Sequence, residues 1–402
     1  MGEPRLVRLN PNVPWKTRGN AALSARFGRG AGPQRRVGEI GGRPVWSSRV
    51  GRPLPDRLVA EFFDRAWERL LAASRAGDAG TDPALVISSH RLPARVYWRA
   101  VREIVPIDDA RELLARSGAR WRTRGSDRGL VGASAAVAWP GGHPTWELLA
   151  YRLPGREGAP RELDGASVRD AQRRFPALFL CHDPRTRRLL VAPHTPCPIL
   201  YGLRATDREA LPRARRRVRS EPVARWMLFR TNQATGDHLI RRPAAEIPEY
   251  GAGIVDGTVS APPVALAGGH VRLSIEDAAG TALDCYAFEP TKTLPRVARS
   301  LRVGDRVRVW GSRSEDPPLR LEGLTLLGLT PRFGRTTPPR CGACDRRARS
   351  LGSVRGYRCP HCRRRWPPEA AVRPQVPPEF PEGRYDPTPS ARRHLALRGP
   401  EP

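Results

Sequence analysis

The residues with the clearest chemistry are four cysteines near the C-terminal end of the chain, arranged as two C-x2-C pairs. Cys341 and Cys344 form the first pair and Cys359 and Cys362 the second, with fourteen residues between the pairs. Four thiolates at this spacing are typical of a zinc ribbon, where they close a tetrahedral site that has no open position. The sequence therefore predicts a structural Zn²⁺ that stabilises the fold and takes no part in catalysis.

A second group of polar residues lies in a loop that follows a short predicted strand over Arg5–Leu9. The hydrogen-bonding side chains of this loop include no acid and are Asn10, Asn12, Lys16, Thr17, Arg18 and Asn20. Such a donor-rich loop suits a bound anion, most simply a phosphate, with Lys16 and Arg18 as candidate catalytic residues. The alternative is a solvated surface loop.

Lysine usage favours the phosphate site over the surface loop. All but two of the 70 lysines and arginines are arginines, and the two lysines are Lys16 and Lys292. A compact ammonium differs from the planar guanidinium in the way it meets a phosphate. Its retention at these two polar, proline-containing motifs marks both lysines as candidate site residues.

Further polar side chains gather where predicted strands end, and they are candidates for contacts to RNA or to a small molecule in a pocket. They are His194, Cys197, Arg204, Arg230, Asn232, Gln233, Asp237, His238 and Lys292. Amide side chains read base edges, whereas arginines hold phosphates. For the stretch around Asn232, the alternative is a structural turn stabilised by its own side chains. For His194 and Cys197, the alternatives are a structural role or a metal site.

Composition narrows the class of partner. The 402 residues carry a formal net charge of +30, which favours a polyanionic partner such as RNA. No apolar run approaches the roughly 20 residues that span a bilayer, and the N-terminus lacks the layout of a signal peptide. Outside the two C-x2-C pairs, Cys181, Cys197 and Cys285 are unpaired, as expected in a reducing cytoplasm.

The elements that must position these residues form a multidomain α/β and α+β protein. A helix is predicted from Asp56, and a buried strand of the parallel type over Ala84–Ser88. The segment Gly28–Pro55, rich in glycine and proline, is taken as a connection. Gly129–Trp139 reads as a closely packed helix that opens a second, smaller α+β unit.

Residues 257–327 give the clearest folded unit. Five predicted strands with a short helix, Pro295–Leu301, between the third and the fourth follow the plan of an OB barrel, whose open face binds single-stranded nucleic acid. After Trp366 the chain is rich in proline and poor in aromatic residues, which predicts a disordered tail.

These motifs, in this order, resemble those of the archaeal 2-agmatinylcytidine synthetases, which act on the minor isoleucine tRNA. The matching runs cover nearly the whole chain to about Trp366 and are Arg5–Asn20, Tyr97–Ile104, Pro193–Pro198, Phe229–Gln233 with Asp237 and His238, Glu289–Lys292, and the four cysteines. The resemblance implies an ATP-dependent ligase that joins agmatine to C2 of the wobble cytidine in the isoleucine tRNA with a CAU anticodon, forming agmatidine and allowing AUA to be decoded.

The resemblance also implies domain types and cofactors. The domains would be a kinase-like domain (1–125), a ferredoxin-like domain (126–222), an OB fold with a preceding linker strand (223–330), a zinc ribbon (338–366) and a disordered tail (367–402). The cofactors would be ATP, Mg²⁺ and structural Zn²⁺. Agmatine is a dication, so its pocket should offer acids or aromatic faces, and Asp183, Asp237 and Trp139 are the candidates.

One departure from the family concerns the N-terminus. Family members begin with a strand and an acidic Asp-Asp-Thr-Asp-type loop for magnesium, whereas only Met1–Pro4 precede Arg5 here. We expect that the true start lies some tens of residues upstream. The alternative is a truncated product that binds tRNA or other single-stranded nucleic acid through the OB fold and the ribbon without catalysis.

Overall fold

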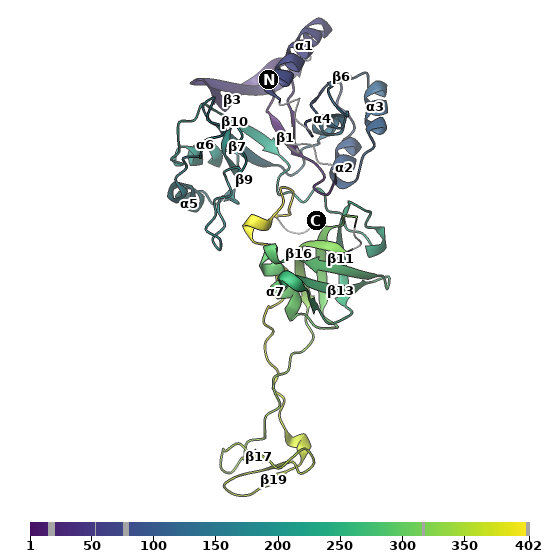
Figure 1. Cartoon of the computed structure of the whole chain (residues 1–402), viewed down its shortest axis with the longest axis vertical. Helices are drawn as coiled ribbons and strands as arrows, with labels where there is room; N and C mark the ends of the chain where they lie inside the picture. Colours follow the sequence, from purple (N-terminus) through teal and green to yellow (C-terminus); the bar gives the residue numbers. More distant parts are fainter. Residues whose placement is uncertain (15–20, 53, 75–79, 316–317, 399–402) are drawn as a thin grey trace.

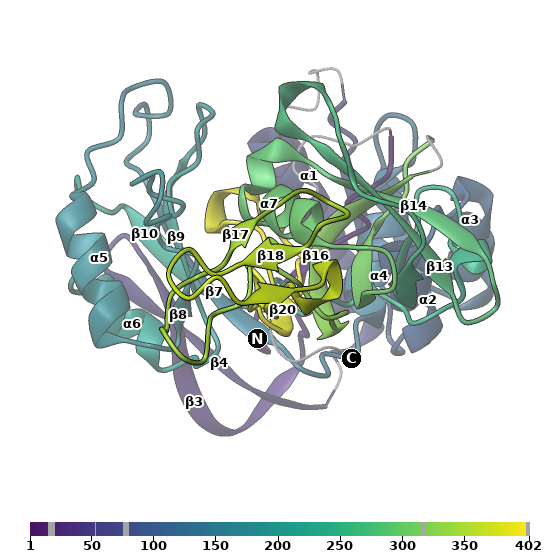
Figure 2. The same ribbon diagram turned by 90° about the horizontal axis from the view of Figure 1, so that it is seen from below.

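The structure is a computed structural model that describes residues 1–14, 21–52, 54–74, 80–315 and 318–398. The fold is mixed α/β, with a large α/β body, a β-barrel beside it, and a small ribbon at the end of two long extended segments (Figure 1). Seen from below, helices α5 and α6 lie on one side of the body and α2 and α3 on the other (Figure 2).

An eight-stranded sheet forms the centre of the α/β body. Its path runs β2-β1-β10-β7-β9-β8, and β3 pairs with β10 and with β4. The strands are β1 (Arg5–Arg8), β2 (Ala21–Ser24), β3 (Arg29–Ile40), β4 (Arg43–Arg52), β7 (Thr145–Tyr151), β8 (Leu178–Phe179), β9 (Ile199–Ala205) and β10 (Arg225–Thr231). The sheet therefore joins strands from both sides of the predicted domain boundary at residue 125.

Strand β10 lies inside this sheet, which differs from its predicted role as a linker strand of the barrel. Trp226, Leu228 and Phe229 are buried, and β10 pairs in parallel with β1 on one edge and antiparallel with β7 on the other. A strand with apolar residues facing both sides is stable only where helices or strands cover both faces. The segment that ends in the polar motif is thus fixed by the core of the body.

The α/β body contains helices in addition to its sheet. They are α1 (Asp56–Ala73), α2 (Ala94–Arg102), α3 (Ile107–Arg116), α4 (Gly129–Ala138), α5 (Gly165–Arg174) and α6 (Ala210–Arg215). The predicted packed helix is confirmed as α4, whose small residues allow close approach, since a Cβ on Gly132 would lie 3.0 Å from a methyl of Leu9. None of the helices in the described part of the chain is long and apolar enough to cross a membrane.

Two predictions for the first 125 residues were wrong. The strand β5 (Ala84–Ile87) pairs antiparallel with β6 (Arg120–Thr123) in a separate two-stranded sheet, so it is not of the parallel type. The segment taken as a connection instead forms the long β3–β4 hairpin, in which a tight turn at Gly41 and Gly42 uses positive φ. The glycines of the hairpin occur at its turn and at irregular pairs, where such residues are tolerated.

The barrel contains the five predicted strands and the helix between the third and the fourth. Strands β11 (Ala252–Val259), β13 (Val271–Asp277), β14 (Ala282–Ala287), β15 (Arg306–Ser312) and β16 (Leu319–Gly328) follow in sequence, with α7 (Thr293–Ser300) after β14. The pairing of β11 with both β15 and β13 closes the barrel. Alternate residues of each strand, such as Val271, Leu273 and Ile275, fill its core.

The smaller elements complete the described chain. They are β12 (Val264–Ala265), β17 (Arg349–Ser350), β18 (Tyr357–Arg358), β19 (Arg365–Trp366), β20 (Gly383–Tyr385), and the 3-10 helices η1 (Ala244–Glu246), η2 (Ala267–Gly269), η3 (Glu289–Thr291), η4 (Pro368–Ala370) and η5 (Pro389–Ala391). Strands β17, β18 and β19 form the ribbon sheet, and two isolated bridges hold its extended connections together.

The chain after the ribbon is ordered up to residue 398, so the prediction of a disordered tail was wrong. Strand β20 adds to the barrel edge at β16, and Leu395 and Leu397 are 1% and 6% exposed. Backbone hydrogen bonds from Ala234 and Gly236 to the carbonyls of His394 and Leu395 attach it to the body. We call residues 383–398 the C-terminal strap, because they run from the barrel to the α/β body (Figure 1).

Candidate functional site

The polar motif that follows β10 lies where the sheet, helix α2 and the barrel meet. Asn232 is fully buried, and its amide accepts a hydrogen bond from the backbone N–H of Arg8 (2.7 Å) and donates to the carbonyl of Arg8 (2.8 Å). The same NH2 donates to the hydroxyl of Tyr97 at 2.8 Å. Asn232 therefore continues the pairing of β10 with β1 and ties both strands to α2.

Asp237 completes this group from the far side of a turn. Its carboxylate accepts a hydrogen bond from Tyr97, and its carbonyl accepts one from Nε of Arg102 at 3.0 Å. Burial, with the nearby charge of Asp237, raises the pKa of Tyr97 far above its usual value, so this hydroxyl stays protonated and donates. The cluster holds α2 against the motif.

A carboxylate that sequence reasoning missed, Glu147 on β7, is the centre of a second group. Glu147 is 1% exposed and accepts from Nε of Arg204 at 3.1 Å, while Nη2 of Arg8 lies 4.0 Å from its other oxygen. The side-chain NH2 of Gln233 also donates to Glu147. An acid in the middle of an otherwise apolar strand, Thr-Trp-Glu-Leu-Leu, was the signal that could have found it.

His238 lies deeper, against the barrel. Its Nε2 is 2.9 Å from Oε2 of Glu322 on β16, and both side chains are buried. Burial alone raises the pKa of Glu322, but the attraction and hydrogen bond of His238, with help from Arg393 and Ser312, lower it to about 2. This pair fixes the body to the barrel at the end of the motif.

The predicted phosphate loop is only partly within the described residues. Lys16, Thr17, Arg18 and Asn20 lie outside them. Asn10 is buried, and its NH2 donates to the carbonyls of Glu103 and Tyr250 at 3.3 and 3.0 Å, so its amide is engaged in joining α2 to the barrel. Asn12 accepts from Arg393 of the C-terminal strap.

Arg230 is the last residue but one of β10 and contacts the backbone just after the C-terminal end of α4. Its Nη2 donates to the carbonyl of Gly141 at 2.5 Å, and Nη1 of Arg5 donates to the carbonyl of Trp139 at 2.9 Å. The carbonyls at a helix C-terminus attract cations. Burial and the neighbouring arginines Arg26, Arg230 and Arg91 lower the pKa of Arg5 to about 10.

The remaining candidates lie apart from the junction. His194 is exposed and accepts from Nε of Arg188 at 3.1 Å, and Cys197 lies 3.2 Å from Nη2 of Arg161. Neither belongs to a metal-binding group among the described residues. Lys292 forms an ion pair with Glu289 at the start of α7.

The three side chains considered for agmatine all have other partners. Asp183 is buried and accepts from the strap residue Ser390 and from two backbone N–H groups of its own turn. Asp237 accepts from Tyr97. The ring of Trp139 is 2% exposed and lies beneath the guanidinium groups of Arg5 and Arg230, which makes it a poor face for a dication.

Two cavities border the C-terminal strap. One, of about 280 Å³, is lined by Phe288, Arg320 and Glu322 of the barrel and by Arg392 and Arg393 of the strap. The other, of about 150 Å³, lies on the side of the sheet and shares the two strap arginines. Its further polar lining consists of Arg204, Gln233, Ser390 and His394.

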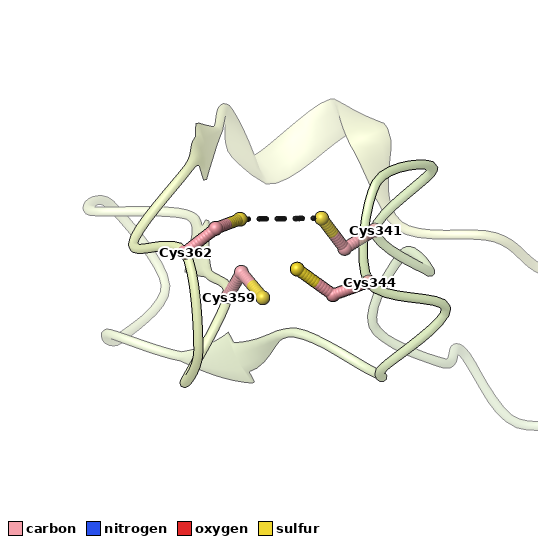
Figure 3. A group of neighbouring side chains, drawn as sticks. All are labelled: Cys341, Cys344, Cys359 and Cys362. Atoms are coloured by element: carbon pink, nitrogen blue, oxygen red, sulfur yellow. Dashed lines mark hydrogen bonds between the residues drawn. The ribbon is translucent and has the colours of Figure 1, made fainter.

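The zinc site has the geometry expected for its ligands. The sulfur atoms of Cys341, Cys344, Cys359 and Cys362 converge from two turns and lie within 4.8 Å of one another (Figure 3). The Sγ atoms of Cys341 and Cys362 are 3.4 Å apart. Zn–S bonds of about 2.3 Å in a tetrahedron place sulfur atoms about 3.8 Å apart, so the four cysteines fit a Zn²⁺ ion.

Three family descriptions match successive parts of this chain. Residues 1–124 match the TiaS TCKD domain, residues 127–238 the TiaS FLD domain, and residues 338–374 the TiaS C-terminal zinc ribbon domain. The second match extends to the end of the polar motif after β10, in agreement with the position of that strand in the sheet.

Relatives and solved structures match nearly the whole chain. The isoleucine-tRNA 2-agmatinylcytidine synthetase TiaS of Archaeoglobus fulgidus is 34% identical over 98% of this chain and 88% of its own, and that of Thermofilum pendens is 34% identical over 98% and 85%. The crystal structure of apo TiaS, an isoleucine-tRNA agmatidine synthetase, superposes with a TM-score of 0.82 at 33% identity, covering 99% and 88%. The complex of TiaS with its isoleucine tRNA, AMPCPP and agmatine gives 0.77 at 31% identity, covering 99% and 87%.

Proposed function

Because the chain belongs to the TiaS family of isoleucine-tRNA 2-agmatinylcytidine synthetases, we propose that it joins agmatine to the wobble cytidine of an isoleucine tRNA with a CAU anticodon, using ATP. Similarity over 98% of the chain at 34% identity supports this activity, as does the superposition on a complex that contains the isoleucine tRNA, an ATP analogue and agmatine. A purely RNA-binding role is less favoured, because the matches include the whole body as well as the barrel and the ribbon.

ATP is needed because the amine of agmatine cannot displace the 2-oxo group of cytosine unaided. The 2-oxo group of cytosine is amide-like and is a poor leaving group. Transfer of a phosphoryl group to that oxygen makes it leave as phosphate when the primary amine of agmatine attacks C2, and the amine nitrogen loses its proton. Mg²⁺ would accompany the ATP phosphates and offset their charge.

The single observation that carries the proposal is the position of the motif Phe229–Gln233 with Asp237 and His238. Its side chains hold β1, α2 and β16 in one place, so the loop from Asn10, the sheet and the barrel share one junction. We propose that this junction binds the anticodon loop and the reacting groups. Lys16, Thr17, Arg18 and Asn20 would hold the ATP phosphates, and Arg230 of the motif would contact the RNA.

We infer the domain types from the same arrangement. The five-stranded barrel with a helix after its third strand supports an OB fold, and the body supports kinase-like and ferredoxin-like parts that share one sheet. We place the end of the second part after β10, near residue 238. Since tRNA and ATP are cytoplasmic substrates, we propose that the protein acts in the cytoplasm.

Incorporation of labelled agmatine into RNA tests the activity. We expect incorporation into a transcript of the isoleucine tRNA with a CAU anticodon that depends on ATP. A transcript whose wobble cytidine is replaced by uridine is the matched control and should remain unlabelled. Failure to label the CAU transcript, with ATP and Mg²⁺ present and the tRNA bound, would leave only the binding role.

A further inference from the structure

The C-terminal strap separates the two cavities at the junction, and its two adjacent arginines line both of them. Figure 1 shows the strap as the yellow segment between the barrel and the α/β body. A segment in this position forms part of the wall of any site between the body and the barrel. The chemistry of its side chains therefore decides what that wall can bind.

The strap is rigidly attached, so its arginines are held in place. Leu395 packs in the core of the body beside Tyr97 and Trp139, and Leu397 packs with Trp310 of the barrel. At the other end, the hydroxyl and backbone N–H of Ser390 donate to the buried carboxylate of Asp183. Anchors on both sides of the two arginines fix the backbone between them.

The guanidinium group of Arg393 retains donors for a further ligand. Its polar contacts with other described residues all run through Nη1, which reaches Asn12, Ser312 and Glu322. A guanidinium offers five N–H donors, more than these contacts require. Arg393 thus keeps donors that these contacts do not use, and it lines both cavities.

The guanidinium group of Arg392 is held by other residues of the strap and also keeps N–H donors that these contacts do not use. Its Nε donates to the carbonyl of Pro387 at 3.1 Å, and its Nη2 lies 3.6 Å from a carboxylate oxygen of Asp386. Both partners belong to the strap, so they orient the guanidinium without tying it to either wall. The contacts use fewer than the five N–H groups that the side chain offers.

The charge of both cavities is positive. The cavity beside the sheet is lined by Arg392, by Arg393 and by Arg204, whose charge is balanced by Glu147, and no acid is among its lining residues. The cavity beside the barrel has Arg320 in addition to the strap arginines, and its acid, Glu322, is already paired with His238. A dication such as agmatine is repelled from such a lining, whereas a phosphate is attracted.

We propose that the C-terminal strap forms a binding site for a phosphate of the tRNA backbone, with Arg392 and Arg393 as its donors. This inference rests on the proposed function, since it assigns a tRNA contact to the same junction. ATP could supply a phosphate as well, but the loop containing Lys16 is the site proposed for its phosphates. The aromatic ring of Phe288 lines the neighbouring cavity, and the guanidinium of Arg320 lies 6.0 Å from its centre.

Arg392→Gln and Arg393→Met test the site, with Arg57→Gln as the matched control. Arg57 lies on α1, its side chain is 90% exposed, and its recorded ion pair is with Glu61, so the control loses the same charge from a site that takes no part in the junction. Affinity for the tRNA transcript is measured at several salt concentrations, together with the KM for ATP and the Tm.

Each strap variant should bind tRNA about tenfold more weakly, the effect of one charge-assisted hydrogen bond. The slope of log K against log salt concentration should become shallower by about 0.7 to 1 for each lost phosphate contact. The ATP KM and the control variant should match the wild type. Unchanged tRNA affinity and slope would overturn the proposal, and so would a raised ATP KM with unchanged tRNA affinity.

Arg320→Gln provides an independent test if the strap variants fail to fold, since Arg320 is on the barrel wall and not on the strap. It should show the same shallower salt slope if RNA phosphate passes between the two walls, and an unchanged slope would contradict that path. Agmatine incorporation by the wild type is measured in parallel. If the wild type neither binds tRNA nor incorporates agmatine, the proposed function is refuted. If the wild type is active and the variants have unchanged tRNA affinity and salt slope, only the strap site is refuted.

Discussion

Glu147 and Arg204 stand directly opposite each other on the antiparallel strands β7 and β9, and Nε of Arg204 lies 3.1 Å from Oε1 of Glu147. Glu147 is almost completely buried, so the pair is a charged contact inside the sheet. Gln233, from the motif after β10, also donates to this carboxylate. The cross-strand pair therefore sets the position of the motif.

Replacing Glu147 by Gln should destabilise the α/β body. The change leaves Arg204 and Arg8 largely buried beside a neutral amide, and loss of one partner from a buried pair costs about 3–5 kcal/mol of unfolding free energy. Denaturant unfolding measures the loss. Glu112→Gln is the control, because Glu112 is exposed and pairs with Arg116 on α3, where a change within about 0.5 kcal/mol is expected. Equal losses of unfolding free energy for the two substitutions would show that the buried pair contributes no more to stability than an exposed one.

Acid should weaken the contact between body and barrel through Glu322. The folded pKa of Glu322, about 2, lies below the value of 4.5 for an unperturbed glutamate, so the folded state favours the carboxylate. The stabilisation is complete above about pH 4.5 and is lost as the pH falls towards 2. Thermal unfolding of the wild type and of Glu322→Gln between about pH 5 and 2.5 checks this.

The Tm of Glu322→Gln should be lower than that of the wild type at about pH 5, and the difference should shrink on acidification. Gln cannot titrate, so the variant lacks the contribution that the wild type loses. A difference that stays constant over the whole pH range would contradict the assignment of that contribution to Glu322.

The zinc ribbon should be needed for tRNA affinity but not for the ATP site. Cys341→Ser removes one of four ligands, and the metal stabilises a ribbon that has only three two-residue strands among the described residues. We expect loss of bound zinc and weaker tRNA binding, with ATP hydrolysis unchanged. Metal analysis, tRNA binding and ATPase assays measure these effects, and Cys285→Ser, at a buried thiol of the barrel, is the control for loss of a cysteine. A wild-type protein free of zinc would remove the basis of this prediction.

Lys16→Ala should abolish ATP turnover and leave tRNA binding intact. The prediction follows from the composition of its loop and from the rarity of lysine in this chain, because Lys16 itself lies outside the described residues. The other lysine supplies a control. Lys292 is paired with Glu289 on the barrel, so Lys292→Ala should keep ATP turnover. Survival of ATP hydrolysis in Lys16→Ala would show that the loop does not hold the nucleotide phosphates.

The barrel and the zinc site were predictable because local sequence determines them. Alternation of apolar residues in strands such as Val271–Asp277 sets the face that enters the barrel core, and the two C-x2-C pairs set the metal site. Helix α4 was predictable for a similar reason, since a run of small apolar residues has few uses other than close packing.

The strap and the centre of the junction were not predictable, because they depend on contacts between distant parts of the chain. Leu395 and Leu397 are two apolar residues in a proline-rich tail, and only the space between the body and the barrel makes them core residues. The structural role of Glu147 depends on hydrogen bonds from Arg204, which lies 57 residues later in the chain, and from Gln233. Composition within a window carries no information on such pairs.

Position-resolved nucleoside mass spectrometry of the reacted tRNA tests the central claim most directly. The isoleucine tRNA transcript with a CAU anticodon is incubated with the protein, agmatine, ATP and Mg²⁺, and the nucleoside at the wobble position is identified. We predict that cytidine is replaced there by its 2-agmatinyl derivative, with one agmatine per tRNA and no change when ATP is omitted. An unmodified wobble cytidine in tRNA that the protein demonstrably binds, or agmatine attached at another position, would contradict the account.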